Sequence, residues 1–178
     1  MRKLVSKTLK QIALGGALAA IATSGFAANQ GTPGFTSTGD LLITLDVAEE
    51  MQISSLIDMP FGTFAGADQT LTSPACIYRS GGSQLYDITA TGSGVGGAFV
   101  ISGGGFTIPY AVDYTDDNTN TNAMAPGTPW GGTGTDTDAA CANTGDNGSI
   151  DVTITAANAS AVPQGAYAGT LTLLVAPR

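Results

Sequence analysis

Along much of this chain apolar and polar side chains alternate one by one, in runs bounded by Gly, Asn, Asp, Pro and Ser. Because successive side chains of a strand point to opposite faces of a sheet, the alternation predicts half-buried β-strands. No stretch after residue 27 has a convincing helical period. Seven or more short strands in one domain predict an all-β sandwich or barrel. The strands are expected at residues 41–47, 51–57, 69–72, 75–79, 85–90, 106–114, 150–155 and 167–175.

The stretches between these runs predict loops. Residues 92–97 are rich in Gly, and residues 115–137 are rich in Thr, Asn, Asp, Gly and Pro, which favours a long exposed loop. Pro109 lies on the polar face of the aromatic run 106–114, and it predicts an edge strand or a bulge because proline cannot donate a ladder hydrogen bond. Asn147-Gly148 is a turn signal just before the run 150–155.

The N-terminus has the pattern of a secretory signal peptide over residues 1–27. A basic start precedes the apolar stretch 12–21 and the small-residue site Gly25-Phe26-Ala27. This stretch is too short for a membrane span, and no other stretch approaches about 20 apolar residues. The chain is therefore expected to be exported without membrane insertion. The basic residues of the start are Arg2, Lys3, Lys7 and Lys10.

The charges after residue 27 exclude several classes of function. Arg79 and Arg178 are the basic side chains of this part, against 14 acidic ones, and it contains no Lys or His. That inventory rules out Ser-His-Asp and Cys-His catalysis, His-ligated metals and lysine chemistry, so we expect no catalytic residues, no metal site and no cofactor. Nucleic acid is a poor partner because binding it requires neutralisation of phosphates by Lys and Arg.

Cys76 and Cys141 are the two cysteines of the chain. In an oxidising compartment they predict one disulfide. It closes a loop of about 65 residues, for which chain-entropy models give roughly 4 kcal/mol of stabilisation. A redox role would favour a close C-x-x-C pair, so we interpret the bond as a structural staple.

Two loop features leave a binding role open. Trp130 stands in a polar stretch, where it could stack on a sugar or pack over one end of the sandwich. A group of Asp and Asn residues could give oxygen ligands to Ca²⁺ or simply form turns. That group consists of Asp116, Asp117, Asn118, Asp136, Asp138 and Asp146.

The segment just after the signal peptide has two interpretations. Four apolar residues share one of its faces, and the acidic pair Glu49-Glu50 follows them. It is either the first strand of the domain's own sheet or a strand offered to a neighbouring molecule. Burial of the four side chains would contribute roughly 6 to 12 kcal/mol at about 1.5 to 3 kcal/mol each. They are Leu41, Ile43, Leu45 and Val47.

Together these features resemble a chaperone-usher pilin, with the middle of the chain similar to the alpha-type and archaic (spore-coat-U-like) pilins. The resemblance rests on three motifs and extends over nearly all of the chain after residue 27. The N-terminal motif is Gly39-Asp-Leu41-Leu-Ile43-Thr-Leu45-Asp-Val47. The middle reads Cys76-Ile-Tyr78-Arg-Ser-Gly and Phe106-Thr-Ile108-Pro-Tyr110-Ala-Val112, and the end reads Gly165-Ala-Tyr167-Ala-Gly169-Thr-Leu171-Thr-Leu173-Leu-Val175-Ala-Pro177.

The resemblance implies an incomplete immunoglobulin-like β-sandwich that is completed by donor-strand exchange. Residues 28–48 would be the donor extension and residues 49–178 the pilin domain. Leu171, Leu173 and Val175 would form the floor of an acceptor groove. A periplasmic chaperone would fill that groove first, and an outer-membrane usher would direct its replacement by the donor segment of an identical subunit.

The expected function is therefore that of a structural subunit of an extracellular surface fimbria, polymerising head to tail for adhesion or biofilm formation. The alternative is a binding module, either a tip adhesin or a secreted carbohydrate-binding sandwich. A secreted enzyme is disfavoured because the catalytic groups are missing from the sequence.

Overall fold

The computed structural model describes residues 28–117 and 120–178, so the expected signal peptide lies outside the described residues. By its internal contacts the chain divides into two units between Asp46 and Val47. In the described part of the first unit, Asn29 and Asp40 form an antiparallel bridge through two main-chain hydrogen bonds of 2.9 Å each. Residues 41–50 belong to no strand.

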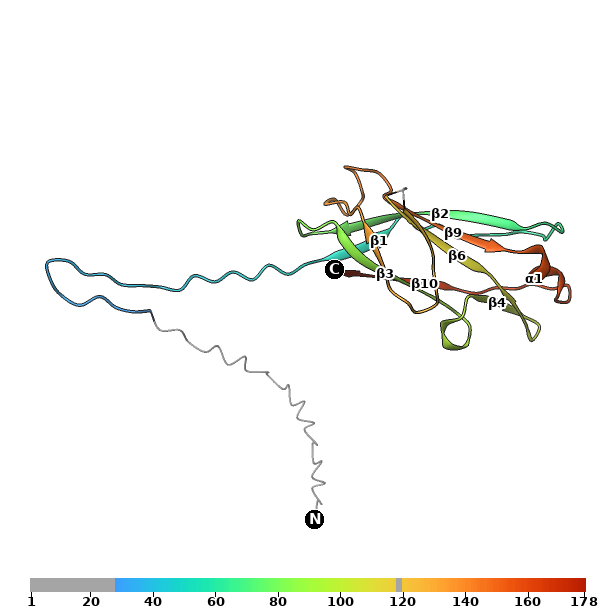
Figure 1. Ribbon diagram of the computed structural model, residues 1–178, viewed down its shortest axis with the longest axis horizontal. Helices are drawn as coiled ribbons and strands as arrows, with labels where there is room; N and C mark the ends of the chain where they lie inside the picture. The colour runs from blue at the N-terminus through green and yellow to red at the C-terminus, as the bar shows by residue number, and fades with distance from the viewer. Residues whose placement is uncertain (1–27, 118–119) are drawn as a thin grey trace, which may run out of the picture. The chain divides into compact units, whose positions relative to one another are not determined.

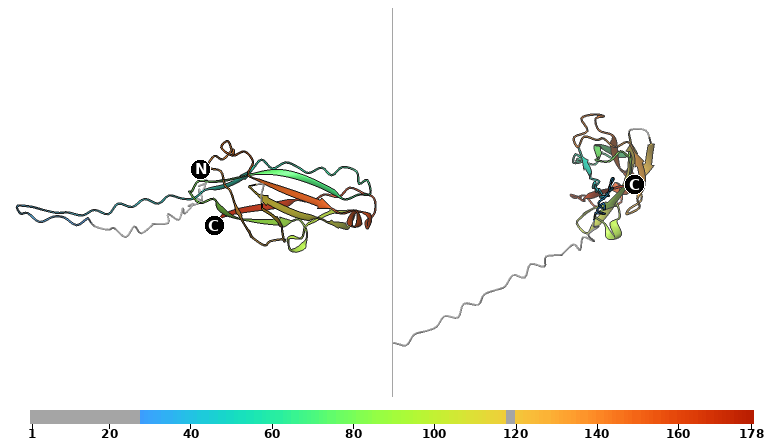
Figure 2. Two further views of the ribbon diagram at one scale, coloured as in Figure 1. Left: turned by 45° about the horizontal axis from the view of Figure 1, so that its top comes forward. Right: turned by 90° about the vertical axis from the view of Figure 1, so that its left-hand side faces the viewer.

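Residues 47–178 form a sandwich of antiparallel strands with a five-stranded and a three-stranded sheet (Figures 1 and 2). The larger sheet has the order β1-β2-β9-β6-β7, the smaller one has the order β10-β3-β8, and β4 and β5 form a separate hairpin. The strands are β1 (Met51–Ser54), β2 (Gln69–Arg79), β3 (Leu85–Gly92), β4 (Val100–Gly103), β5 (Phe106–Pro109), β6 (Ala111–Asp116), β7 (Asn120–Ala123), β8 (Trp130–Thr133), β9 (Gly148–Ile154) and β10 (Leu171–Pro177). A 3-10 turn, η1 (Val95–Gly97), and a short helix, α1 (Ala156–Ser160), complete the described elements.

The core between the sheets is centred on a pair of buried tyrosines. Tyr86 from β3 and Tyr114 from β6 meet edge to face, and their hydroxyl oxygens are 2.7 Å apart. Room for the rings comes from two glycines, since a Cβ on Gly132 would lie 2.5 Å from Tyr86 and one on Gly148 would lie 2.5 Å from Tyr114. Burial raises the pKa of Tyr86 above its ordinary value and that of Tyr114 to about 12.

The expected all-β, immunoglobulin-like fold is confirmed, while several strand assignments need correction. The runs 69–72 and 75–79 form one strand, β2, despite Pro74. The proline is tolerated because β1 pairs only with Cys76–Arg79, so Pro74 has a strand partner, β9, on one side only. The run 106–114 is instead two strands, β5 and β6, which belong to different sheets and separate at Tyr110.

The expected loop 115–137 was also wrong in part. It contains β7 and β8, and Thr135 and Asp136 within it are buried. Trp130 packs edge to face on Tyr114 in the core, which favours the packing interpretation over sugar stacking. The short helix α1 had no periodic signal because five residues are too few to show one. Among the described residues no helix has the length and apolar character needed to cross a membrane.

Candidate functional site: an open groove beside the last strand

A groove of about 1410 Å³ lies within the sandwich unit. One side is the edge strand β10, which pairs with β3 and has no second strand partner among the described residues. The other side is the segment of residues 56–64, which follows β1 and forms no strand. The apolar lining comes mainly from Ile101, Ile108, Tyr110, Ile150, Val152, Ile154, Leu171 and Leu173.

The wall of residues 56–64 is fixed by side chains and not by a ladder. β1 ends before Ser55, which has a φ of 63°. The Ile57 amide donates to Ser73 Oγ at 3.0 Å, and Gln69 Nε2 donates to the Phe61 carbonyl at 3.2 Å. Two main-chain groups of the wall are thus bonded to side chains of β2, while residues 56–64 belong to no strand. Leu56 and Ile57 on the wall are 47% and 58% exposed, so part of the apolar surface of the wall is open to solvent.

Leu171 and Leu173 line the groove, but Val175 on the same face of β10 does not. All three side chains, Leu171, Leu173 and Val175, are partly buried against the core, and β1 lies close to β10. The groove is thus open near the start of β10 and α1, whose Ala159 and Ser160 contribute to its lining. Figure 1 shows α1 and the C-terminus at opposite ends of the sandwich, and Figure 2 agrees.

The Gly-x-Tyr-x-Gly motif forms the end of the groove. Residues 166–169 lie against β4, with two main-chain hydrogen bonds between Ala168 and Ser102. A Cβ on Gly169 would lie 2.8 Å from the Val100 oxygen, so glycine is required for this close approach. Tyr167 lines the groove and donates its hydroxyl to the Pro163 carbonyl at 2.8 Å, which ties the loop before β10 together.

The four apolar residues of the expected donor segment are exposed. Leu41, Ile43, Leu45 and Val47 are 70%, 83%, 86% and 75% exposed, respectively. Exposure of these apolar side chains to water is unfavourable. Their burial against a partner would therefore lower the free energy.

Behind this segment the chain is anchored at the end of the sandwich where β10 stops. Arg79 is buried, and its Nη2 atom binds both carboxylate oxygens of Glu49, at 2.8 and 2.9 Å. Its Nη1 atom donates to the main-chain oxygens of Leu85 and, at 3.3 Å, Arg178. Ser80 adds two hydrogen bonds to the main chain of Glu50, of 2.7 and 3.0 Å.

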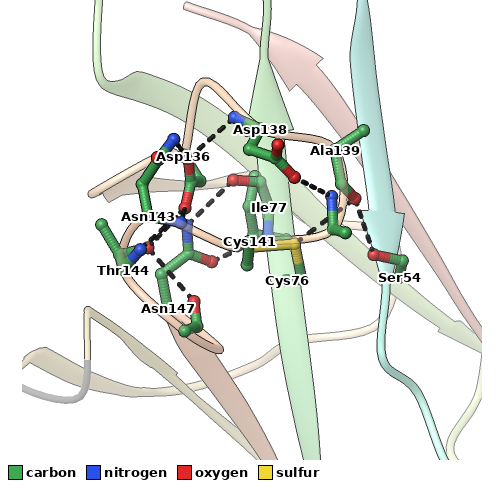
Figure 3. The surroundings of a disulfide bond; sticks show 12 residues. Ser54, Cys76, Ile77, Asp136, Asp138, Ala139, Cys141, Asn143, Thr144 and Asn147 are labelled. Carbon is green, nitrogen blue, oxygen red and sulfur yellow. Dashed lines mark hydrogen bonds between the residues drawn. A yellow bond between two sulfur atoms is a disulfide. The ribbon is translucent and has the colours of Figure 1, made fainter.

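The predicted disulfide is present between Cys76 of β2 and Cys141, as Figure 3 shows. It holds a loop that is organised around the buried carboxylate of Asp136. That carboxylate accepts hydrogen bonds from the amides of Asp138, Asn143 and Thr144 and from the side chains of the last two. These bonds, led by the Asp138 amide, lower the pKa of Asp136 below its ordinary value.

Asn147 replaces a strand partner for β2 near the disulfide. Its side-chain oxygen accepts from the Ile77 amide at 2.7 Å, and its Nδ2 atom donates to the Ile77 carbonyl at 2.9 Å (Figure 3). Because Asn147 is buried and uses both ends of its amide, the turn signal Asn147-Gly148 has a structural role in this loop.

Asp116 and Asp138 of the acidic group also accept hydrogen bonds within their loops. Asp116 accepts hydrogen bonds from the Asn120 amide and from the amide and hydroxyl of Thr133. In the described ranges no group of three or more His, Cys, Asp or Glu residues is arranged to hold a metal ion. Asn118 lies outside the described residues.

The sequence of this chain matches no family model and no curated protein. A solved chain from a chaperone–tip adhesin complex that functions in CFA/I fimbriae biogenesis has a similar structure, with a TM-score of 0.51 at 14% identity. The two chains therefore share a fold. The match covers 72% of this chain and 41% of the solved chain, so this chain corresponds to less than half of that neighbour.

Sequence patterns pointed to the leucines of β10, but they missed the other parts of the groove. Most of the wall 56–64 and of the loop 159–170 has no alternation, and residues 56–57 and 167–170, which were expected in strands, lie outside them. The ion pair of the buried Arg79 was also missed. The sequence offered one signal for it, since Arg79 is one of two basic residues after residue 27.

Proposed function

We propose that this chain is a structural subunit of a bacterial surface fimbria that polymerises by donor-strand exchange. Residues 41–47 of one copy would enter the groove of another, with Leu41, Ile43, Leu45 and Val47 directed at its floor. The observation that carries the proposal is the open apolar groove beside an edge strand, in a chain that also carries an exposed alternating apolar segment.

The geometry of the groove supports a strand as its occupant. Among the described strands β10 has a partner on one edge only, so a strand laid along its other edge would gain main-chain hydrogen bonds while its alternate side chains fill the apolar floor. Leu171 and Leu173 belong to that floor. Val175 does not line the groove, so it is not assigned to the floor that the occupant would meet.

Export would place the subunit at the cell surface, with a periplasmic chaperone and an outer-membrane usher as its assembly partners. The likeness to a chain from a chaperone–tip adhesin complex supports a role in fimbriae, in which this chain would act by binding and not by catalysis. The same likeness favours a second candidate, a tip adhesin. The exposed donor segment supports the polymerising subunit instead, because an adhesin at the tip has no further copy to complete.

The test uses matched substitutions on the two faces of the donor segment. Ile43→Asp places a charge where an apolar pocket should receive the side chain, and it should lower the yield of fibres at least about tenfold. Thr44→Asp changes the opposite face and should leave the yield within about twofold. Fibres are counted by electron microscopy of the purified chain and of sheared cell-surface material. Equal yields from the two variants would contradict the proposal.

A peptide of residues 39–48 tests the groove directly. Bound in the groove, it should raise the melting temperature of the chain in proportion to the logarithm of its concentration, since a ligand of the native state stabilises by mass action. A peptide carrying Ile43→Asp is the control. No shift with either peptide would mean that the groove does not accept this strand.

A further inference from the structure

The polar face of the donor segment, residues 41–47, carries one large apolar side chain. Leu42 shares this face with Thr44 and Asp46, because alternate residues of an extended chain point the same way. Leu42 is exposed. Burial of Ile43 and the other residues of the apolar face in a groove would turn Leu42 outward, so the groove does not account for this leucine.

The outer face of β10 carries a matching residue. Leu174 is exposed, whereas Leu173 before it packs against the core. In the register of β10 with β3, Leu174 pairs with Thr89 and Thr172 pairs with Thr91, so Leu174 lies on a face of threonines. On its other side β10 has no strand partner among the described residues. A strand laid along this edge would therefore cover apolar surface of Leu174.

Two constraints limit how a donor strand can align with β10. The strand pairs of the unit are antiparallel, and a donor that continues this pattern runs opposite to β10. Its apolar face has to point toward the core as Leu173 does, and a slip of one residue would turn that face to solvent. The register can therefore change only in steps of two residues, which places Leu42 opposite Thr172, Leu174 or Ala176 of a second copy.

The register with Leu42 opposite Leu174 matches the two strands on both faces. On the outer face the two leucines meet, and Thr44 stands opposite Thr172. On the inner face three donor residues stand opposite residues that line the groove. These pairs are Ile43–Leu173, Leu45–Leu171 and Val47–Gly169.

The register with Leu42 opposite Ala176 brings Asp40 opposite Arg178. This arginine does not favour the register, because its Nε atom is 3.8 Å from Asp87 Oδ1. Asp87 belongs to β3, so the guanidinium lies on the side of β10 that is away from the free edge. The same register also moves the apolar face of the donor toward the end of β10, beyond the lining of the groove.

The register with Leu42 opposite Thr172 leaves both leucines beside polar groups. Leu174 would then stand opposite the carboxylate of Asp40. No apolar surface is buried between the strands on the outer face in that case, so this register loses the cross-strand contact that the middle one gains.

We propose that Leu42 of one copy and Leu174 of the next form a contact on the outer face of the joined sheet, and that this contact sets the register of the donor strand. The inference rests on the proposed function, because it takes residues 41–47 as the occupant of the groove. It adds two specificity-determining residues that lie outside the groove. They are needed because an apolar floor accepts alternating apolar side chains that are displaced by one step of two residues.

Cysteine pairs test the register. Directly opposite residues of two strands are about 4.5–5.5 Å apart and can form a disulfide, whereas diagonal neighbours are about 7–8 Å apart. The peptide of residues 39–48 carrying Leu42→Cys is mixed with the full chain carrying Leu174→Cys in a glutathione buffer, and mass spectrometry of the digested product measures the linked fraction. Both positions are exposed, so the substitutions leave the core intact. The unsubstituted peptide contains no cysteine.

Two pairs that are out of register are the matched controls. The peptide with Thr44→Cys and the chain with Leu174→Cys report on the register displaced toward the end of β10. The peptide with Leu42→Cys and the chain with Thr172→Cys report on the register displaced toward its start. Each should link at least about tenfold less than the matched pair, because its cysteines are diagonal neighbours. Addition of Ile43→Asp to the Leu42→Cys peptide should abolish the link, since the strand no longer enters the groove.

The contact should also contribute to affinity. Leu42→Ala in the peptide and Leu174→Ala in the chain should each weaken binding about two- to fivefold, the size of a cross-strand pair, and together they should weaken it little more than either does alone. Leu42→Ala in the peptide with Thr172→Ala in the chain is the control pair, whose effects should multiply.

A higher yield from either pair that is out of register overturns the inference, as do equal yields from all three pairs. Effects of Leu42→Ala and Leu174→Ala that simply multiply would also overturn it. If no pair links while the unsubstituted peptide still shifts the melting temperature of the wild-type chain, the strand occupies the groove in another alignment and the inference fails alone. Failure of the proposed function has a separate signature, because the unsubstituted peptide would then produce no shift.

Discussion

Asp136 shows how one buried carboxylate organises a long loop in this acidic chain. Its main chain is hydrogen-bonded to the Ile77 carbonyl and the Arg79 amide of β2. Its side chain accepts hydrogen bonds from the turn that contains Cys141 (Figure 3). A buried charge is tolerated when hydrogen bonds satisfy its oxygens, and here both oxygens accept more than one. The carboxylate therefore holds residues 138–144 in place by hydrogen bonds, in a loop that has no strand ladder.

The lowered pKa of Asp136 predicts an acid-dependent loss of stability. The unfolded chain protonates this group near its ordinary value of about 3.9, whereas the folded chain keeps it ionised to lower pH. Its contribution is thus fully present above about pH 4 and is lost as the pH falls toward the folded-state pKa. Urea unfolding of the wild type and of Asp136→Asn should show a difference in free energy of unfolding that is largest near neutral pH and shrinks below pH 4.

Asp46→Asn is the control for this experiment because Asp46 is exposed. Its free energy of unfolding should follow the wild type at every pH. A constant difference between the wild type and Asp136→Asn down to about pH 2 would show that the ionisation of Asp136 is not what stabilises the loop.

Among the elements, the approach to β10 depends on two chain segments coming unusually close. Residues 166–169 lie against β4 before the chain continues as β10 against β3, so one extended stretch contacts two partners in turn. Gly169 and Gly103 stand at the two points of closest approach, since an added Cβ would lie 2.8 Å from the Val100 oxygen and 2.0 Å from the Ala166 oxygen, respectively.

Substitution of the two glycines in the Gly-x-Tyr-x-Gly motif should have unequal effects. Gly169→Ala drives a methyl group into the backbone of β4 and should lower the free energy of unfolding by about 1–3 kcal/mol. A Cβ on Gly165 meets nothing nearer than 3.9 Å, and its φ is not positive, so Gly165→Ala should change stability by less than about 1 kcal/mol. Urea unfolding of both variants measures the difference. An equal loss in free energy of unfolding for the two variants would mean that the close approach at Gly169 is not the reason why glycine is needed there.

At the same scale, the alternation of side chains predicted the strands that bury one face, and it failed where pairing changes. β9 and β3 follow their expected ranges closely because their alternate residues face the core throughout. The run 106–114 kept a perfect alternation across the break at Tyr110, since β5 and β6 both direct a face inward although they join different sheets. β8 has little alternation because a side chain at Gly131 or Gly132 would clash with Arg178 or Tyr86, respectively. This requirement comes from tertiary packing, so the local sequence pattern does not predict it.

For the candidate site, the sequence predicted its apolar residues and left its shape undetermined. Leu171 and Leu173 could be assigned to a floor because their face needs burial, and both line the groove. The wall opposite β10 begins where β1 ends, next to the left-handed backbone of Ser55. The serine itself gives no signal for that conformation, which is why the extent of the groove follows only from the structure.

At the scale of the whole molecule, the Cys76–Cys141 bond is the covalent link between β2 and the loop that precedes β9. The two cysteines are 65 residues apart in sequence, so the bond removes many conformations from the unfolded chain. Neither cysteine lines the groove. The bond should therefore stabilise the sandwich without contributing to the recognition of a strand.

The double variant Cys76→Ala with Cys141→Ala separates these two effects. Its free energy of unfolding should fall by roughly 2–5 kcal/mol, the range found when a long-loop disulfide is removed. Under conditions where this variant is still folded, its affinity for the peptide of residues 39–48 should stay within about twofold of the wild type. Titration of the peptide against both proteins at low temperature measures this, with the circular dichroism spectrum confirming that the variant is folded. A loss of affinity above about tenfold in the folded variant would show that the disulfide shapes the groove, because a staple that acts on the unfolded chain leaves the native binding surface unchanged.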